Sequence, residues 1–171
     1  MNEIRWPVKY LPGTTDNYVS NEVIVEGLAA KDVWPWLNNA TKWPTYYDNA
    51  SKIGFDNNAG PELSLHARFR FTTFGLDVEG EVTEYEPPIA GKPARIAWRA
   101  WVDGTEEDAI DVLHAWLIED LPDNRVRVLT QESQIGKPAL EMSKAKPNPM
   151  LNKHQDWLEG LVRTAFLNAE R

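Results

Sequence analysis

The last stretch of the chain has the clearest periodic pattern of hydrophobic residues. In residues 148–168 the apolar positions recur three and four residues apart, which predicts an amphipathic α-helix. Asn148 suits the N-cap, and Pro149 suits the first helical position because its missing N–H needs no partner there. Such a helix cannot bury its apolar face alone, so the rest of the chain must cover it. The expected inner face consists of Met150, Leu151, His154, Trp157, Leu158, Leu161, Val162, Ala165 and Phe166.

Alternating apolar and polar residues predict strands through most of the preceding chain. The predicted strands are residues 18–27, 49–56, 63–74, 75–83, 94–103, 110–119 and 125–134. The inner face of the third strand is expected to hold Leu63, Leu65, Ala67, Phe69, Phe71 and Thr73. The sixth strand is apolar on both faces, which indicates that both faces are covered. Two short helices are predicted between the first and second strands, at residues 31–39 and 42–47.

This order of elements predicts an α+β fold, in which a curved, seven-stranded antiparallel sheet wraps around a long C-terminal helix. Residues 1–17 are expected to form an irregular arm whose aromatic side chains pack on the domain. Residues 136–147 are expected to form a loop or a broken helix. The sequence has no internal repeat and no linker-like segment, so we expect a single domain over residues 1–171.

The composition narrows the range of functions. The chain has 171 residues, enough for a substantial core, and eight tryptophans, each of which can bury a large area. It has no cysteine, which excludes disulfides, thiolate zinc sites and cysteine nucleophiles and fits a cytoplasmic location. The formal net charge of −8 disfavours binding to nucleic acid or to anionic membranes. There is no long apolar run and no secretory signal at the start, so we expect no integral membrane association.

The best candidates for chemistry lie on the last predicted hairpin. Its turn contains Pro122, Asp123 and Asn124, which favour a type I turn followed by a left-handed residue. With these three residues in the turn, the pairing of the two strands places His114 directly opposite Glu132 on the inner face, with Cβ atoms about 5 Å apart. A buried carboxylate beside an imidazole can act as a general acid or base. The alternative is a satisfied polar pair that orders the cavity wall or fixes a ligand, and it is favoured because perturbed titratable groups are only candidates for function.

The other two histidines have different expected positions. His154 lies on the inner face of the last helix, where it faces the interior or bonds to a loop carbonyl at the helix edge, and His66 lies on the outer, arginine-bearing face of its strand. Two inward histidines and Glu132 offer two nitrogens and one oxygen to zinc, but the sequence lacks the short helical spacing of a metal motif. It also lacks a glycine-rich phosphate loop and a serine nucleophile elbow. We therefore predict no metal and no cofactor.

Three short segments resemble a known family. They are Val33-Trp34 through Trp43-Pro44, Phe74-Gly75 through Glu84-Tyr85-Glu86-Pro87 to Ala97-Trp98, and His114-Ala115-Trp116 with Thr130-Gln131-Glu132-Ser133. Over about residues 18–168 the chain resembles the helix-grip proteins of the START-like (SRPBCC) superfamily, which include polyketide cyclase/dehydrase-like proteins and relatives of the birch pollen allergen. The resemblance implies a cavity between sheet and helix that binds a small, largely apolar molecule. It implies no single reaction, because the superfamily includes carriers, receptors, cyclases, dehydratases and chaperone activators.

The resemblance leads to three hypotheses about function. The first is a carrier that binds a small apolar or aromatic ligand, without catalysis, in a cavity of roughly 300–1,000 Å³. The second is a polyketide cyclase/dehydratase-like enzyme in which His114 and Glu132 move protons, and the third is a partner-binding module of the chaperone-activator type. The assembly is expected to be a monomer or a homodimer. For the Phe and Trp residues among the predicted ligand-binding residues, the alternative is plain core. The predicted ligand-binding residues are Phe69, Phe71, Trp98, His114, Trp116, Glu132, His154 and Trp157.

Overall fold

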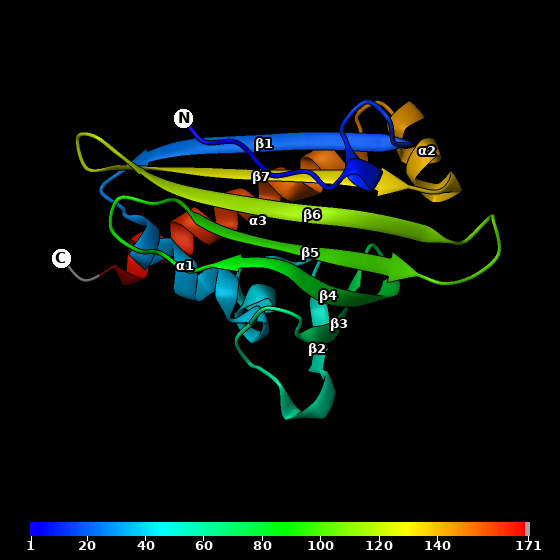
Figure 1. Ribbon diagram of the computed structural model, residues 1–171, viewed down its shortest axis with the longest axis horizontal. Helices are drawn as coiled ribbons and strands as arrows, with labels where there is room; N and C mark the ends of the chain where they lie inside the picture. The colour runs from blue at the N-terminus through cyan, green and yellow to red at the C-terminus, as the bar shows by residue number, and fades with distance from the viewer. Residues whose placement is uncertain (170–171) are drawn as a thin grey trace.

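The computed structural model describes residues 1–169 and confirms the predicted α+β class. A seven-stranded antiparallel sheet curves around a long C-terminal helix, α3 (Figure 1). The strands are β1 (Asn17–Glu26), β2 (Ser51–Phe55), β3 (Arg68–Thr73), β4 (Leu76–Glu86), β5 (Ala94–Val102), β6 (Ile110–Leu121) and β7 (Arg125–Ile135). The helices are α1 (Ala30–Asn38), α2 (Lys137–Lys144) and α3 (Pro149–Asn168), with the 3-10 helices η1 (Val8–Tyr10), η2 (Ala40–Thr45) and η3 (Asp56–Asn58). Within this described chain, no helix is both long enough and apolar enough to cross a membrane.

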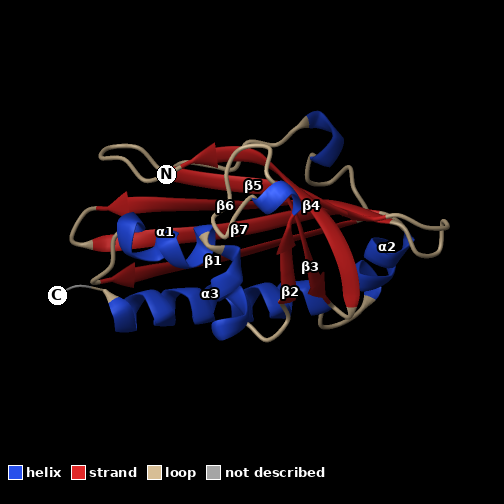
Figure 2. Ribbon diagram, turned by 90° about the horizontal axis from the view of Figure 1, so that it is seen from below, coloured by secondary structure: helices blue, strands red, loops and turns tan. Residues whose placement is uncertain are grey.

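The order of strands across the sheet is β1-β7-β6-β5-β4-β3-β2, so β1 and β2 form the two edges. All neighbours pair antiparallel. α3 lies along one face of this sheet, and α1 lies beside it on the same face (Figure 2). The space between sheet and helices is therefore the place for the main core.

α3 is fixed to the sheet at its N-terminal half. Asn148 caps the helix by accepting a hydrogen bond from the backbone N–H of Met150 at 3.1 Å. Asn21 of β1 donates hydrogen bonds to the backbone carbonyl of Leu151 at 3.1 Å and to the side chain of Gln155 at 3.0 Å. The buried face of α3 consists of Met150, His154, Trp157, Leu158, Gly160, Leu161 and Ala165.

An aromatic cluster fills the centre of the core around Trp43 of η2. The Trp43 indole stacks on Trp98 at 5.2 Å between ring centroids and meets Trp157 edge-on at 5.0 Å. Phe69 and Phe71 of β3 also contact Trp43 edge-on. The Trp43 Nε1–H donates to the carbonyl of Leu37 at 2.8 Å, so the polar edge of this fully buried ring is satisfied.

The strand predicted for residues 63–74 begins only at Arg68, so the prediction was wrong for its first five residues. His66 has a positive φ of 68°, which interrupts the alternation of side chains. The backbone N–H of His66 donates to the carbonyl of Val82, and the backbone N–H of Val82 donates to the carbonyl of Ala67. Because of this irregular pairing, the Leu65 side chain is 49% exposed and does not face the interior. On α3, two residues predicted to be inside, Leu151 and Phe166, are also exposed.

The outer face of the sheet is covered by the N-terminal residues. Ile4 and Trp6 pack on a small apolar cluster that β5, β6 and β7 form on this face, made of Ala97, Ala115, Leu117 and Leu129. The buried Arg127 guanidinium donates to the backbone carbonyl of Asn2 at 2.8 Å and forms ion pairs with Glu22 and Glu119. This second cluster explains why β6 is apolar on both faces, as its sequence indicated.

Gly160 marks the closest approach of α3 to the rest of the protein. A Cβ atom at this position would lie 2.3 Å from the backbone carbonyl oxygen of Tyr46. We predict that Gly160→Ala lowers the free energy of unfolding by about 1–3 kcal/mol, because helix and loop must separate. At an exposed helical site, a change from Gly to Ala would instead raise the free energy of unfolding by up to about 1 kcal/mol.

Urea unfolding measures this effect. The control is Asn152→Ala, at an exposed position of the same helix, which should leave the free energy of unfolding nearly unchanged. A Gly160→Ala variant that is as stable as the wild type, or more stable, would contradict this packing of α3.

Candidate functional site

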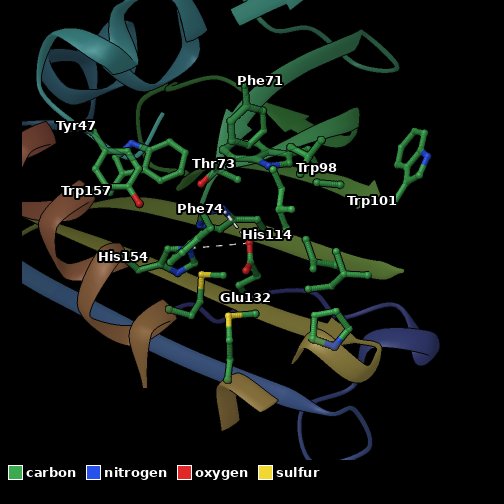
Figure 3. A pocket seen from close by; sticks show the side chains of 18 residues that line it. Tyr47, Phe71, Thr73, Phe74, Trp98, Trp101, His114, Glu132, His154 and Trp157 are labelled. Carbon is green, nitrogen blue, oxygen red and sulfur yellow. Dashed lines mark ion pairs between the residues drawn. The ribbon is translucent and has the colours of Figure 1, made fainter. Parts of the chain in front are cut away.

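A cavity of about 180 Å³ lies between the inner face of the sheet and α3 (Figure 3). It is walled by β3 to β7, by α2 and α3, and by Tyr47 after η2. Most of its surface is apolar. The lining residues are Tyr47, Phe71, Thr73, Phe74, Leu76, Val78, Trp98, Ala100, Trp101, Ile110, Val112, His114, Glu132, Pro138, Met142, Met150, His154 and Trp157.

Six of the eight predicted ligand-binding residues line this cavity: Phe71, Trp98, His114, Glu132, His154 and Trp157. Phe69 and Trp116 do not, and both are fully enclosed in the core. Phe69 packs beneath Gly80, where an added Cβ would lie 2.8 Å from its ring. Trp116 lies one inward position beyond His114 on β6, with its ring centroid 5.4 Å from that of Trp157. The cavity is also smaller than predicted, because aromatic side chains fill the rest of the space.

The sequence did not predict the half-exposed end of the cavity. It is formed by the β3–β4 turn, the end of β5 and the start of α2, with Phe74, Leu76, Trp101 and Met142 among its residues. Phe74 adopts a positive φ of 50°, and its backbone N–H donates to the Asn49 side chain at 2.9 Å. The only signal in the sequence was the Phe74-Gly75 turn itself, which does not reveal what lies across from it.

The inner end of the cavity contains three buried titratable side chains. As the hairpin register predicted, His114 of β6 pairs with Glu132 of β7, and His114 Nδ1 lies 3.3 Å from Glu132 Oε1. His154 of α3 reaches the same oxygen with Nε2 at 3.9 Å (Figure 3, dashed lines). The two imidazole rings stack with centroids 4.4 Å apart and an interplanar angle of 11°. Trp98 and Trp157 pack edge-on against His114.

Hydrogen bonds fix the position of the proton on His114. Its Nε2 lies 2.8 Å from the Thr130 hydroxyl, and that hydroxyl donates its own proton to the carbonyl of Ala115 at 3.3 Å. The hydroxyl has only one proton, so both hydrogen bonds form together only when His114 donates from Nε2. In that tautomer the Nδ1 lone pair faces Glu132.

A chain of side-chain hydrogen bonds holds the Glu132 carboxyl group from the other side. Its Oε2 accepts a short hydrogen bond from the Gln134 amide. The Gln134 carbonyl accepts from Asn17 at 2.8 Å, and the Asn17 carbonyl accepts from Asn148 at 2.9 Å. Asn148 is the N-cap of α3, so the orientation of the carboxyl group is coupled to the start of that helix.

Burial makes all three groups uncharged near neutral pH. It raises the pKa of Glu132 to about 8, against a smaller opposite effect of the Gln134 hydrogen bond. It lowers the pKa of His154 to about 3. Burial, and to a lesser extent the neighbouring His154, lowers the pKa of His114 well below its usual value. A neutral Glu132 also avoids the repulsion between a carboxylate and the Nδ1 lone pair of His114.

The same three residues are the group of potential metal ligands within the described part of the chain, with one ligand atom of each within 4.8 Å of the others. A metal ion lies near the plane of each imidazole that binds it, at about 2.0–2.1 Å from the nitrogen. Two rings stacked face to face do not share such a position. The geometry therefore does not fit a metal ion without rotation of one ring, and the absence of a metal stays a prediction.

Comparison with solved structures places the fold in a class. The chain resembles norcoclaurine synthase from Thalictrum flavum, in complex with dopamine and hydroxybenzaldehyde, with a TM-score of 0.63 at 8% identity over 100% of this chain and 98% of that one. It also resembles protein MLL2253 from Mesorhizobium loti, with a TM-score of 0.65 at 11% identity over 90% and 100% of the two chains. At these identities the likeness concerns the fold alone. The chain has the helix-grip fold of the START-like and birch-pollen-allergen-like proteins.

One relative is much more similar in sequence. The crystal structure of hypothetical protein jhp0584 from Helicobacter pylori has a TM-score of 0.92 at 48% identity, over 96% of this chain and 97% of that chain. The protein belongs to the same family as this Helicobacter pylori protein. No protein-family model and no curated protein sequence matches the chain.

The raised pKa of Glu132 predicts a specific dependence of stability on pH. The unfolded chain loses the Glu132 proton near pH 4.5, whereas the folded protein keeps it up to about pH 8. Between these values the free energy of unfolding falls as pH rises, by up to about 1.4 kcal/mol per pH unit. The lowered histidine pKa values act in the opposite direction only below about pH 6.5. The window from about pH 6.5 to 8 therefore isolates Glu132.

Urea unfolding at several pH values in this window tests the prediction. The wild type should lose stability as pH rises, and Glu132→Gln should lose little or none, because an amide does not titrate. The matched control is Glu119→Gln on the outer face of β6, where the pKa is lowered, so the wild-type slope should persist. Equal slopes for the wild type and Glu132→Gln would show that Glu132 is already ionised at neutral pH.

Proposed function

We propose that this protein binds a small, largely apolar molecule in the cavity between the sheet and α3, as a carrier or ligand-binding protein. The main observation in support of this proposal is the cavity itself. Protein interiors are normally packed to the density of organic crystals. An open, mostly apolar space beside a tryptophan-rich core therefore supports ligand binding. An open cavity also favours ligand binding over the partner-binding hypothesis, which requires a filled core and an exposed groove.

The shape of the cavity limits the size of the ligand. An engineered apolar cavity of about 150 Å³ binds benzene, so a cavity of 180 Å³ suits a molecule with one ring and a short substituent. Trp98, Trp157 and Phe71 offer aromatic faces and edges to such a ring. In the same fold, the norcoclaurine synthase of Thalictrum flavum was solved with dopamine and hydroxybenzaldehyde, which are molecules of this size. A cytoplasmic location and a monomeric or homodimeric state stay predictions.

Filling the cavity should abolish binding without unfolding the protein. Val112 of β6 lines the cavity and is paired with Ala100 of β5, so a Phe side chain at position 112 would occupy the open space. We expect Val112→Phe to weaken the binding of toluene, a one-ring apolar probe, by more than about tenfold. Quenching of tryptophan fluorescence can report binding, because three tryptophans line the cavity.

The control is Val8→Phe, the same substitution at a position that is 83% exposed on η1, and it should bind toluene like the wild type. Ala100→Leu provides a second filling variant in case Val112→Phe folds poorly. Native mass spectrometry of the purified protein should in addition detect a bound small molecule in the wild type and lose it in both filling variants. Unchanged toluene binding in both filling variants would rule out this cavity as the binding site.

A second function has a specific observation in its favour. A carboxylic acid whose pKa is about 8, beside an imidazole, is suited to donate or accept a proton near neutral pH. An acid–base enzyme of the cyclase/dehydratase type would use Glu132 and His114 in these roles. The carrier proposal and this alternative share the cavity and differ only in whether a bound molecule is converted.

Glu132→Gln and His114→Ala separate the two functions. If the pair is catalytic, each variant should reduce turnover of the co-purified compound or its precursor by roughly 10²–10⁴-fold, while affinity is nearly kept. Turnover is followed by mass spectrometry, and Glu119→Gln serves as the control with full activity. No turnover by the wild type, with binding intact, would leave the carrier function in place.

A further inference from the structure

We propose that the ligand is an uncharged one-ring molecule carrying a hydroxyl or carbonyl oxygen, and that this oxygen is held at the inner end of the cavity between Glu132 and His154. The proposal rests on the function proposed above and specifies the ligand. Its basis is the arrangement of polar atoms at the inner end, together with the absence of formal charge in the cavity walls.

Three polar atoms meet at the inner end of the cavity: Oε1 of Glu132, Nδ1 of His114 and Nε2 of His154. The distance from Oε1 to Nε2 of His154 is 3.9 Å, which is too long for a direct hydrogen bond. An oxygen atom between Glu132 Oε1 and His154 Nε2 would supply the hydrogen bonds that these two atoms do not make to each other. The other nitrogen of His154, Nδ1, is enclosed and has no partner within the described residues, and such an oxygen would not satisfy it.

The side chains that line the cavity disfavour a charged ligand. None of the lining residues is a lysine, arginine or aspartate, and Glu132 is the only acidic one. The titratable groups that face Glu132 are His114 from β6, His154 from α3 and Tyr47 from the segment after η2. Burial keeps the two histidines and Glu132 uncharged near neutral pH, and it raises the pKa of Tyr47, which is uncharged there already. A carboxylate or ammonium ligand would lose its hydration without gaining a counter-ion.

Differences in burial define the direction in which the ligand lies. His114, Glu132 and His154 are each at most 5% exposed, whereas Leu76 at the other end of the cavity is 44% exposed. Apolar side chains line the path between these ends. The ligand oxygen is therefore expected to point inward and its ring to lie against Trp98 and Trp157.

A series of one-ring probes tests this inference on the full-length protein. Toluene, benzyl alcohol, benzaldehyde, benzoate and benzylamine have similar rings and differ in polarity and charge. By titration calorimetry at pH 7, benzyl alcohol and benzaldehyde should bind roughly two- to tenfold more tightly than toluene, as one hydrogen bond allows. Benzoate and benzylamine should bind more weakly than toluene.

Two substitutions at one position separate hydrogen bonding from shape. Glu132→Leu should remove the preference for benzyl alcohol over toluene while toluene still binds. Glu132→Gln retains a hydrogen-bonding group and should keep that preference. As pH rises through about 8, the wild type should lose affinity for benzaldehyde, whose carbonyl oxygen only accepts and loses its donor when Glu132 ionises, and Glu132→Gln should not.

The outcomes distinguish this inference from the proposed function. If toluene binds as tightly as benzyl alcohol, or benzylamine binds best, the ligand class is wrong but the cavity still binds ligands. Zinc binding that displaces benzyl alcohol and is abolished by Glu132→Gln would also overturn the inference. If no probe binds and native mass spectrometry finds no bound molecule, the proposed function fails together with the inference.

Discussion

The attachment of α3 to the sheet fixes both the core and the candidate site. Asn148 caps the helix, and its amide starts the hydrogen-bond chain through Asn17 and Gln134 that ends on the Glu132 carboxyl group. The same helix turns its apolar face, including Trp157, onto the aromatic cluster around Trp43. A shift of α3 would therefore disturb core packing and the orientation of the carboxyl group together. This coupling explains how a long, otherwise simple helix can hold a polar site in a fixed geometry.

Burying three titratable groups in a protein core costs free energy. Burial disfavours the charged form of His114, Glu132 and His154, as the directions of their pKa shifts express. Apolar side chains of similar size would avoid that cost and would remove the unpartnered nitrogen of His154. Structural reasons account for the aromatic residues around them, but not for this group. The ligand contact that we propose would use this group, which lies at the closed end of an open cavity.

The sequence predicted those parts of the structure that depend on local periodicity. The β6–β7 register was predicted correctly, and helical spacing placed His154 on the inner face. The predicted type I turn was wrong, because Asp123 as well as Asn124 has a positive φ. Features that depend on contacts between distant segments could not be predicted. Phe69 and Trp116 have the right alternation for a cavity wall, yet Gly80 and Trp157 enclose them. The half-exposed end of the cavity combines a hairpin turn with α2, and no periodic pattern links those two segments.

The register of β7 also determines the electrostatics of the site. Arg127 and Glu132 are separated by an odd number of positions on this strand, so they project from opposite faces of the sheet. On the outer face the Arg127 guanidinium is neutralised by Glu22 and Glu119 under the N-terminal residues. On the inner face no cation among residues 1–169 lowers the pKa of Glu132, and desolvation raises it. A slip by one residue would exchange the two faces, moving the Arg127 guanidinium to the inner face and the Glu132 carboxyl group to the outer face. The pairing that closes the hydrophobic core is thus the same one that keeps Glu132 protonated.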